Sequence, residues 1–336
     1  MPFSFCGRRC RRNLILIFLL AVLTLALTYL PTGYFVVSPG MTKDVSEMIT
    51  VTGGAKAPGA GHFLMTTVAT REANFWLLLY GALDPASELR PKSDFIPPGK
   101  TLEEYIQETE RMMQQSQDYA RAAALRALGY PVEIKGDGAK VLEVVPGSPA
   151  QGNLQPGDII TAVADQPVRR VEDLLRIMGE VPVGSRVTVK FRRGEQEQQV
   201  VLSTVENTSR PGRAMLGVRS ESVNETFQFP VEIKIDADHI TGPSAGLMFA
   251  LEIVRQLKKD VDLTGGRVIA GTGTIDASGK VGPIGGIGQK VITAERAGAV
   301  AFLAPRENYD EALRAARKIT VVPVSSLQDA LEFLKK

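Results

Sequence analysis

The strongest constraint on this chain is an uncharged apolar run near its N-terminus. Residues 14–30 have the sequence LILIFLLAVLTLALTYL. A run of about 20 apolar residues is long enough to cross a membrane as a helix. A cluster of arginines precedes the run: Arg8, Arg9, Arg11 and Arg12. Because basic residues favour the cytoplasmic side, we expect a basic cytoplasmic segment over residues 1–12, a transmembrane anchor over residues 13–31 and an extracytoplasmic remainder.

The alternative for this run is a cleaved signal peptide. The apolar core of a signal peptide usually has about 7–15 residues and is followed by a cleavage site of small residues. This run is longer, and the sequence TYLPTGY at its end contains no such site. The pattern therefore favours an uncleaved, single-pass anchor in the cell membrane, with the N-terminus in the cytoplasm.

Charge and composition exclude several classes of partner. The formal net charge is +2 and the chain has a single tryptophan. A nucleic-acid-binding surface generally combines clustered positive charge with aromatic side chains for stacking, so we expect no nucleic-acid partner. Both cysteines, Cys6 and Cys10, lie in the basic segment, and their C-x3-C spacing is a poor metal site. We therefore expect no metal and no cofactor.

Residues 32–125 carry no functional motif. They contain short runs typical of strands (YFVV, MITV and HFLMTTVA), followed by NFWLLLYGAL, which fits a short helix. Thr101 and Glu104 have the spacing of a capping box, at the start of a helix that we expect over residues 101–128. We interpret residues 32–125 as a membrane-proximal β/α module, with this helix as a rigid spacer before the next domain.

The next part of the chain carries a recognisable motif. Residues Pro146 to Val163 have the sequence PGSPAQGNLQPGDIITAV, followed by an amphipathic stretch over residues 171–181 and a hairpin pattern about Arg193-Gly194. This combination resembles a PDZ domain of the type found in bacterial envelope proteases, over about residues 126–206. The resemblance implies a β-rich domain that captures an extended peptide, usually by its C-terminal carboxylate. The alternative is a PDZ fold used only for packing.

A PDZ domain implies a loop that receives the carboxylate of the peptide. We expect this loop in the sequence LGYPVE, beside the helix over residues 171–181. Gly157 and Asp158 form a turn of the motif and are interpreted as structural. The residues expected to bind the peptide are Leu128, Gly129, Tyr130, Pro131 and Val132.

A serine lies within HITGPSAGLMFALEIV, residues 239–254, immediately before an apolar helical run. Pro243 fits the first turn of a helix. This position would place Ser244 at a helix N-terminus, where free N–H groups and the helix dipole favour a negative charge. A tetrahedral oxyanion needs such surroundings. Taken alone, however, the pattern favours a serine that simply caps the helix.

A nucleophilic Ser244 would need a base, and the chain has only two histidines, His62 and His239. Asp238 precedes His239 at the end of an expected strand, where neighbouring side chains diverge. A Ser-His-Asp triad is therefore disfavoured, and we expect His239 to be solvated or locally bonded.

The other candidate base is a lysine. Lys280 follows DASG and has the pattern of a solvated turn residue, whereas Lys290 follows IGGIG and begins the helical pattern QKVITAERA. Near a helix N-terminus and apolar neighbours an ammonium is disfavoured, so its pKa falls. A neutral lysine can accept the proton of a serine hydroxyl, which favours Lys290.

These two motifs together resemble a known family. GPSAG with Ser244, followed 46 positions later by the lysine of PIGGIGQK, is similar to the proteolytic domain of Lon proteases, over about residues 207–336. The resemblance implies an α/β domain in which Ser244 is the nucleophile and Lys290 the general base, with Thr272 hydrogen-bonded to the lysine. Thr274 stands where Lon has a glutamate. The supporting residues around the nucleophile are Gly242, Pro243, Ala245 and Gly246.

The order of anchor, PDZ-like domain and Lon-like domain resembles the PDZ-containing, YlbL-like membrane proteases of bacteria. The expected fold class is therefore α+β multidomain, with an N-terminal transmembrane helix, a β-rich PDZ domain and an α/β proteolytic domain. The implied function is an envelope serine endopeptidase with S16-type chemistry. The alternative is a non-catalytic envelope scaffold that binds the C-termini of partners through its PDZ domain.

Lon proteases use an ATPase module, and this sequence contains no match to its phosphate-binding loop. In GTIDASGKV one residue too many separates Gly273 from Gly279, and Val281 replaces the required Ser or Thr. We therefore expect an ATP-independent enzyme whose partners are unfolded proteins or peptides captured by their C-terminal tails. A homo-oligomer is implied by analogy with the rings of Lon proteolytic domains.

Overall fold

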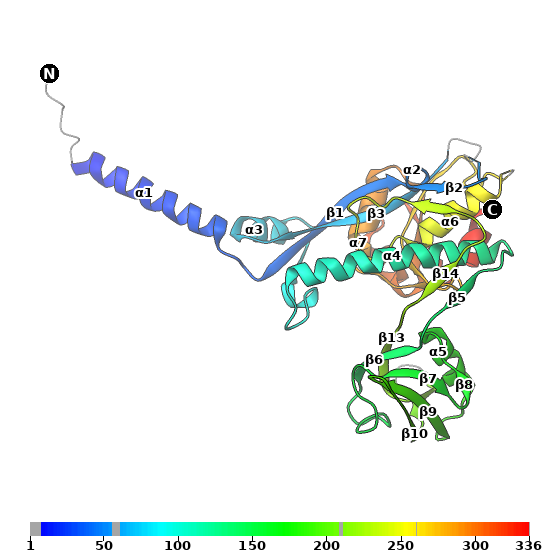
Figure 1. Cartoon of the computed structure of the whole chain (residues 1–336). Helices are drawn as coiled ribbons and strands as arrows, with labels where there is room; N and C mark the ends of the chain where they lie inside the picture. Colours follow the sequence, from blue (N-terminus) through cyan, green and yellow to red (C-terminus); the bar gives the residue numbers. More distant parts are fainter. Residues whose placement is uncertain (1–7, 56–60, 208–210, 260, 336) are drawn as a thin grey trace. The chain divides into compact units, whose positions relative to one another are not determined.

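The computed structural model describes residues 8–55, 61–207, 211–259 and 261–335. It confirms a mixed α/β, multidomain chain with two compact units (Figure 1). The first unit comprises Met1–Pro131 and Pro230–Lys336, and the second unit comprises Val132–Phe229. Expectations that concern residues 1–7, including Cys6, lie outside the described residues.

The N-terminal helix α1 (Arg8–Tyr29) is long and apolar enough from Arg11 to Tyr29 to cross a membrane. It ends two residues before the expected boundary at residue 31. Pro31 accounts for this difference, because a proline disfavours the helical conformation of the residue before it.

The first unit is built on a six-stranded sheet with the order β20-β19-β16-β3-β1-β4. Neighbouring strands from β20 to β3 are parallel, whereas β1 is antiparallel to both of its neighbours. The strands of this sheet are β1 (Tyr34–Asp44), β3 (His62–Glu72), β4 (Glu88–Pro91), β16 (Val268–Gly271), β19 (Ala301–Pro305) and β20 (Thr320–Val324). Two short antiparallel pairs accompany it: β2 (Ile49–Val51) with β15 (Ile233–Ile235), and β17 (Thr274–Ile275) with β18 (Val281–Gly282).

This sheet divides the chain differently from the expected boundaries. Residues 32–125 are not a separate module, because their strands β1, β3 and β4 belong to the same sheet as β16, β19 and β20. The unit that contains the PDZ motif spans residues 132–229 instead of 126–206. The second unit is therefore inserted into the first, between two segments that fold together.

Helices cover both faces of the sheet of the first unit. Ala270 packs in a cluster with residues of α7 and α8, whereas a Cβ on Gly271 would lie 2.7 Å from Met248 of α6. Because successive residues of a strand point to opposite faces, α6 and α7 lie on opposite sides. The helices of this unit, besides α1, are α2 (Val45–Met48), α3 (Phe75–Leu83), α4 (Leu102–Ala127), α6 (Gly246–Leu257), α7 (Ile287–Arg296), α8 (Tyr309–Ala315) and α9 (Leu327–Leu334).

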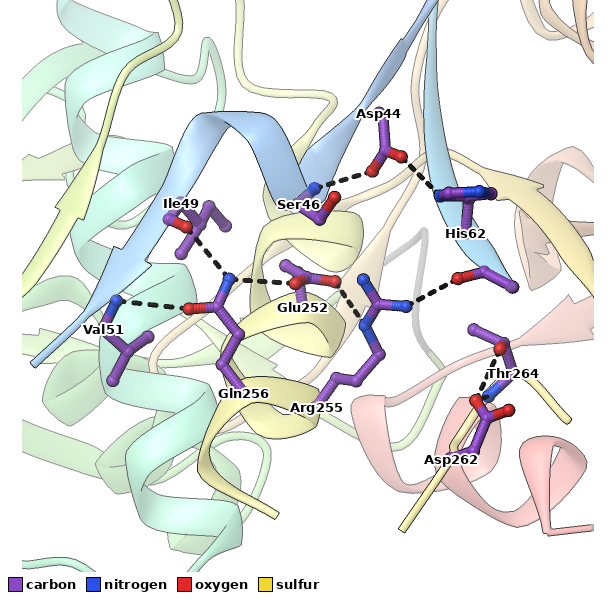
Figure 2. A network of polar contacts seen from close by, with 11 residues as sticks. Asp44, Ser46, Ile49, Val51, His62, Glu252, Arg255, Gln256, Asp262 and Thr264 are labelled. Carbon is purple, nitrogen blue, oxygen red and sulfur yellow. Dashed lines mark hydrogen bonds and ion pairs between the residues drawn. The ribbon is translucent and has the colours of Figure 1, made fainter. Parts of the chain in front are cut away.

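A buried polar network ties the end of α6 to the segment before the second unit (Figure 2). Glu252 and Arg255 form an ion pair at 2.8 Å, and Arg255 Nη1 donates to the carbonyl of Gly61 at 2.8 Å. The amide of Gln256 donates to the carbonyl of Ile49 at 3.0 Å and to Glu252 at 2.9 Å. Buried charges are stable only when they are paired and hydrogen-bonded. The network therefore stabilises the packing of the two halves of the first unit, which are the segments before and after the second unit.

Helix α4 also belongs to the first unit. Its capping box forms as expected, with the Thr101 hydroxyl accepting from Glu104 N and the Glu104 carboxylate accepting from Thr101 N. The expected role as a spacer is wrong, because α4 packs against α6, β17 and α9. The C-terminal half of α4 is accordingly rich in buried alanines.

The second unit has a sheet with the order β10-β9-β7-β6-β13, and β8 pairs with β7. The hairpin turns at Gly194 as expected, where φ is +61°. Asp158 is buried and pairs with Arg193 through two contacts of 2.8 Å, which agrees with its interpretation as structural. The elements of the second unit are β5 (Glu133–Lys135), β6 (Ala139–Val144), β7 (Ile159–Val163), β8 (Gln166–Pro167), α5 (Val171–Glu180), β9 (Arg186–Arg193), β10 (Gln196–Ser203), β11 (Val205–Glu206), β12 (Ala214–Met215), β13 (Val218–Ser222) and β14 (Thr226–Gln228).

Candidate active site

Ser244 lies in the loop that joins β15 to α6, just before the helix. The helix begins at Gly246, and its N-cap is Ala245, which makes no side-chain capping hydrogen bond. The alternative of a serine N-cap is therefore wrong, and Pro243 precedes the helix instead of occupying its first turn. The hydroxyl of Ser244 is free of a capping role and contacts Lys290.

Lys290 is the fourth residue of α7. Its Nζ lies 2.6 Å from Ser244 Oγ and 3.0 Å from Thr272 Oγ1. Only 3% of the residue is exposed, and no carboxylate pairs with it within the part of the chain that the structure describes. Burial lowers the pKa of Lys290 from 10.5 to about 7, because the ammonium loses its hydration. A large fraction of the amine is therefore neutral near neutral pH.

Thr272 follows β16 and fixes the orientation of this amine. Its hydroxyl donates to the carbonyl oxygen of Ser244 at 2.9 Å, so its oxygen can only accept from Lys290. The N–H of Gly273 donates to the same carbonyl at 2.8 Å. A neutral Lys290 that donates to Thr272 has its lone pair available for the Ser244 hydroxyl. The three side chains can thus move a proton from serine to lysine.

The other candidate bases lie elsewhere. The His239 side chain is 100% exposed, and its contact is with Asp238, at 3.5 Å. Lys280 is exposed and lies immediately before β18, where its backbone bridges Ser326. Of the groups considered as bases, only Lys290 is within hydrogen-bonding distance of Ser244.

The supporting glycines shape the loop around Ser244. Gly242 has φ +85°, in the left-handed region that favours glycine. A Cβ on Gly246 would lie 2.8 Å from Ser116 Oγ and from Ile275 Cγ2, so a larger residue would displace α6 from its neighbours. Pro243 and Ala245 complete this loop, and Ala245 is buried.

Helix α4 supplies two contacts to the loop that no sequence motif indicates. Ser116 Oγ donates to the carbonyl of Pro243 at 2.9 Å, and the carbonyl of Thr109 accepts from Gly242 N at 2.9 Å. Both bonds hold the residues just before Ser244. The only signal in the sequence is a small polar residue within MMQQSQ, on a helix more than 100 residues away from the motif.

A cavity of about 780 Å³ opens beside Ser244 and Lys290. Its walls come from β1, β3, α4 and the loop before α6, and they are largely apolar. The apolar side chains include Phe35, Met65, Phe95, Leu102, Ile106 and Met113. The cavity is therefore formed by both halves of the first unit and has room for several side chains of an extended peptide.

The structure places the expected peptide-binding residues outside the body of the second unit. Leu128 is the C-cap of α4, Leu128 to Pro131 belong to the first unit, and Val132 is the first residue of the second. The strand that follows this loop, β5, pairs with β14. These residues therefore connect the two units along the chain.

The second unit offers another strand edge beside α5. β13 is the last strand of its sheet, pairs with β6 and contacts α5. Val171 N at the start of α5 donates to Ser222 Oγ at the end of β13, at 3.0 Å. Leu216 and Gly217 precede β13; Gly217 has φ +82°, and a Cβ there would collide with Ser148. This edge has the surroundings expected for strand addition.

The lowered pKa of Lys290 predicts the pH dependence of any reaction at Ser244. We expect kcat/KM to rise with pH through about 7 and to level off above it, because only the neutral amine accepts a proton. The measurement is kcat/KM for a peptide between about pH 5 and pH 10. A rate that is constant across this range would contradict the assignment of Lys290 as the base.

Two stretches of the sequence are similar to known families. Residues 140–193 match the PDZ domain, and residues 217–334 match the Lon protease (S16) C-terminal proteolytic domain. The second match begins within the second unit, one residue before β13.

Curated proteins similar to this chain include two Lon proteases. Lon protease 2 of Bacillus subtilis is 31% identical over 138 residues, which are 41% of this chain and 23% of the relative. The Lon protease of Methylocella silvestris is 32% identical over 161 residues, 45% of this chain and 18% of the relative. Protease Do-like 8, chloroplastic, of Arabidopsis thaliana is 41% identical over 58 residues, 17% of this chain and 13% of the relative. The chain thus spans less than a quarter of the length of these relatives.

Proposed function

We propose that this chain, which joins a PDZ domain to a Lon-type (S16) C-terminal proteolytic domain, is an ATP-independent, membrane-anchored serine endopeptidase. The proteolytic domain and the Lon proteases among its relatives support a peptidase. The observation that carries the finer proposal is the 2.6 Å contact between Lys290 Nζ and Ser244 Oγ, made by a buried lysine of lowered pKa.

The reaction begins with the transfer of the Ser244 hydroxyl proton to the neutral Lys290 amine, while Oγ bonds to the carbonyl carbon of the substrate. The oxyanion that forms is stabilised by backbone N–H groups at the start of α6, near Ala245 and Gly246. The Lys290 ammonium then gives its proton to the leaving amine as the peptide bond breaks. A water molecule, deprotonated by Lys290, releases the acyl group and restores Ser244.

The cavity beside Ser244 supports a peptide substrate. It combines an apolar wall from α4 and the sheet with polar residues of the loop before α6. An extended chain with apolar side chains would bury them there, whereas a folded protein would not enter. We therefore infer that substrates are unfolded segments or accessible tails.

The free edge of β13 is the site that we propose for peptide capture by the second unit. A peptide would add there as a strand beside α5. The C-terminal carboxylate of the peptide would bind the backbone of the segment before β13, at Leu216 and Gly217. These two residues have the same Leu-Gly sequence as Leu128 and Gly129. Capture would raise the local concentration of the substrate at the cavity.

Helix α1 supports an anchor in the membrane. The arginines on its N-terminal side favour a cytoplasmic N-terminus, which would place both units on the extracytoplasmic side. The stretch GTIDASGKV forms β17, a turn and β18 instead of a strand, phosphate-binding loop and helix, which supports independence from ATP.

The proposal is tested by incubating the full-length chain with an unfolded protein, with and without ATP. We expect equal cleavage under both conditions, and we expect a fluorophosphonate probe to modify Ser244, as located by mass spectrometry. Cleavage only with ATP would contradict the proposed independence. Binding of C-terminal peptides without cleavage or labelling would instead favour a scaffold.

A further inference from the structure

Helix α3 (Phe75–Leu83) exposes an apolar face. Its sequence FWLLLYGAL carries no charge. The exposed fraction of its large side chains ranges from 40% at Phe75 to 75% at Leu83. The exposed large residues are Phe75, Trp76, Leu79, Tyr80 and Leu83. With about 3.6 residues per turn, the spacing i, i+1, i+4, i+5, i+8 places all five on one face of the helix.

The opposite side of α3 is fixed to the sheet of the first unit. Gly81 is buried, and a Cβ there would lie 2.8 Å from Leu89 of β4 and 3.2 Å from Val36 of β1. The start of the helix is capped by Asn74, whose side chain accepts from Leu77 N at 2.9 Å. The apolar face is therefore held outward by a helix that is capped at its start and packed on β1 and β4 at Gly81.

This face adjoins the end of the candidate membrane span. Trp76 Nε1 donates to Thr28 Oγ1 at 3.2 Å, and Thr28 is in the last turn of α1. Tyr29, the final residue of α1, is also exposed. Tryptophan and tyrosine side chains are enriched where a membrane meets water. Three of these aromatic residues, Tyr29, Trp76 and Tyr80, thus occur where α1 would leave the bilayer.

We propose that α3 lies in the extracytoplasmic interface of the bilayer, with its apolar face among the lipid headgroups and upper acyl chains. The partner is a phospholipid surface, and the argument is the continuity of this face with the end of α1. A helix of nine residues is ~13 Å long, so α3 would provide a second contact beside α1. Because α3 is packed on β1 and β4, this contact would restrict the rotation of the first unit about the anchor. The inference rests on the proposed anchor and does not depend on peptidase activity.

The tryptophan of α3 makes a direct test possible. Trp76 is the only tryptophan of the chain, so its fluorescence reports on α3 alone. The full-length protein is reconstituted into phosphatidylcholine vesicles whose acyl chains carry bromine either near the glycerol or near the terminal methyl group. We expect Trp76 to be quenched several-fold more by the shallow bromine and to be protected from acrylamide. Strong quenching by acrylamide with none by either lipid would overturn the proposal.

A second variant separates the effect of α3 from that of α1. Because Trp76 contacts α1, its position alone does not establish that the whole helix reaches lipid. Combining Trp76→Phe with Leu83→Trp moves the probe to the far, exposed end of α3, where we expect the same shallow quenching. If only acrylamide quenches the tryptophan at position 83, the proposal is overturned. If neither acrylamide nor the brominated lipids quench it, the proposal is also overturned, and contact with a second copy of the chain is indicated.

Flotation of the vesicles distinguishes failure of this inference from failure of the anchor. If the protein floats with the vesicles but residue 83 is accessible to water, α1 is a membrane anchor and α3 does not contact lipid. Protein that does not float would reject both, and the cleavage assay would still decide whether the chain is a peptidase.

Discussion

Replacing Ser244 with alanine is expected to lower kcat/KM for peptide cleavage by about 10⁴-fold or more, because the nucleophile of a covalent mechanism is lost. The effect on folding should be small. The side chain of Ser244 caps no helix, and its hydrogen bond with Lys290 contributes about 1 kcal/mol to stability. Activity and stability should therefore separate in this variant.

The measurement compares initial cleavage rates of an unfolded, fluorescently labelled protein, together with the midpoint of thermal unfolding. Ser203→Ala is a suitable control, because Ser203 is an exposed serine at the end of β10 in the second unit. The Ser203→Ala variant should cleave the substrate at the wild-type rate. If Ser244→Ala retained the wild-type rate, Ser244 would not be the nucleophile and any observed cleavage would arise from another site or from a contaminant.

The contact between Ser244 and Lys290 could be anticipated from the sequence because its signals are local and of different kinds. In the segment before Ser244, apolar and polar residues alternate, and this pattern ends at a glycine and a proline. The segment before Lys290 is rich in glycine. Both patterns indicate that a helix begins near a polar side chain. The resemblance to Lon then links two segments that periodicity alone does not connect. The structure brings their side chains to 2.6 Å.

The contribution of residues 34–72 to the same domain could not be anticipated in this way. β3 pairs with β16 across the inserted second unit, and Thr66 contacts Gly271 at a separation of 205 residues. The alternation of a strand shows which face is buried but not which strand lies beside it. The same reason explains why Ser116 on α4 was missed, since nothing in a helical pattern identifies the loop that the helix holds.

The proposed peptide site of the second unit illustrates a different limit. The pair Leu-Gly occurs before two candidate strands, at Leu128-Gly129 and at Leu216-Gly217. Sequence offers no means to choose between them, because both precede short β-like runs. The sheet topology distinguishes them: β5 belongs to a two-stranded sheet with β14, whereas β13 is the edge strand of the main sheet of the second unit and contacts α5.

Replacing Lys290 with methionine is expected to abolish activity and to stabilise the protein. The rate should fall by about 10³-fold or more, because Ser244 loses the base that accepts its proton. The gain in stability has a separate cause. An ammonium at this site is buried almost completely, and methionine fills a similar volume without the cost of desolvation. Loss of activity with a gain in stability would not be expected for a residue that only supports the fold.

The sign of the pH dependence follows from the two pKa values of Lys290. The unfolded chain has the ordinary value of 10.5 and the folded chain a value of about 7. Between these values the unfolded state binds more protons, so the contribution of Lys290 to stability becomes more favourable as pH rises. Below about pH 7 the folded wild type carries the full cost of the buried ammonium, which is at most about 5 kcal/mol.

The advantage of Lys290→Met should therefore be large at about pH 6 and smaller at about pH 9.5. It is measured as the difference in the free energy of unfolding between variant and wild type at each pH. Lys280→Met is the matched control for activity, because Lys280 is an exposed lysine just before β18 and lies outside the contacts of Ser244. This variant should cleave at the wild-type rate. An advantage of Lys290→Met that grew with pH would show that Lys290 is charged in the folded state. A variant as active as the wild type would show that Lys290 does not act as the base for Ser244.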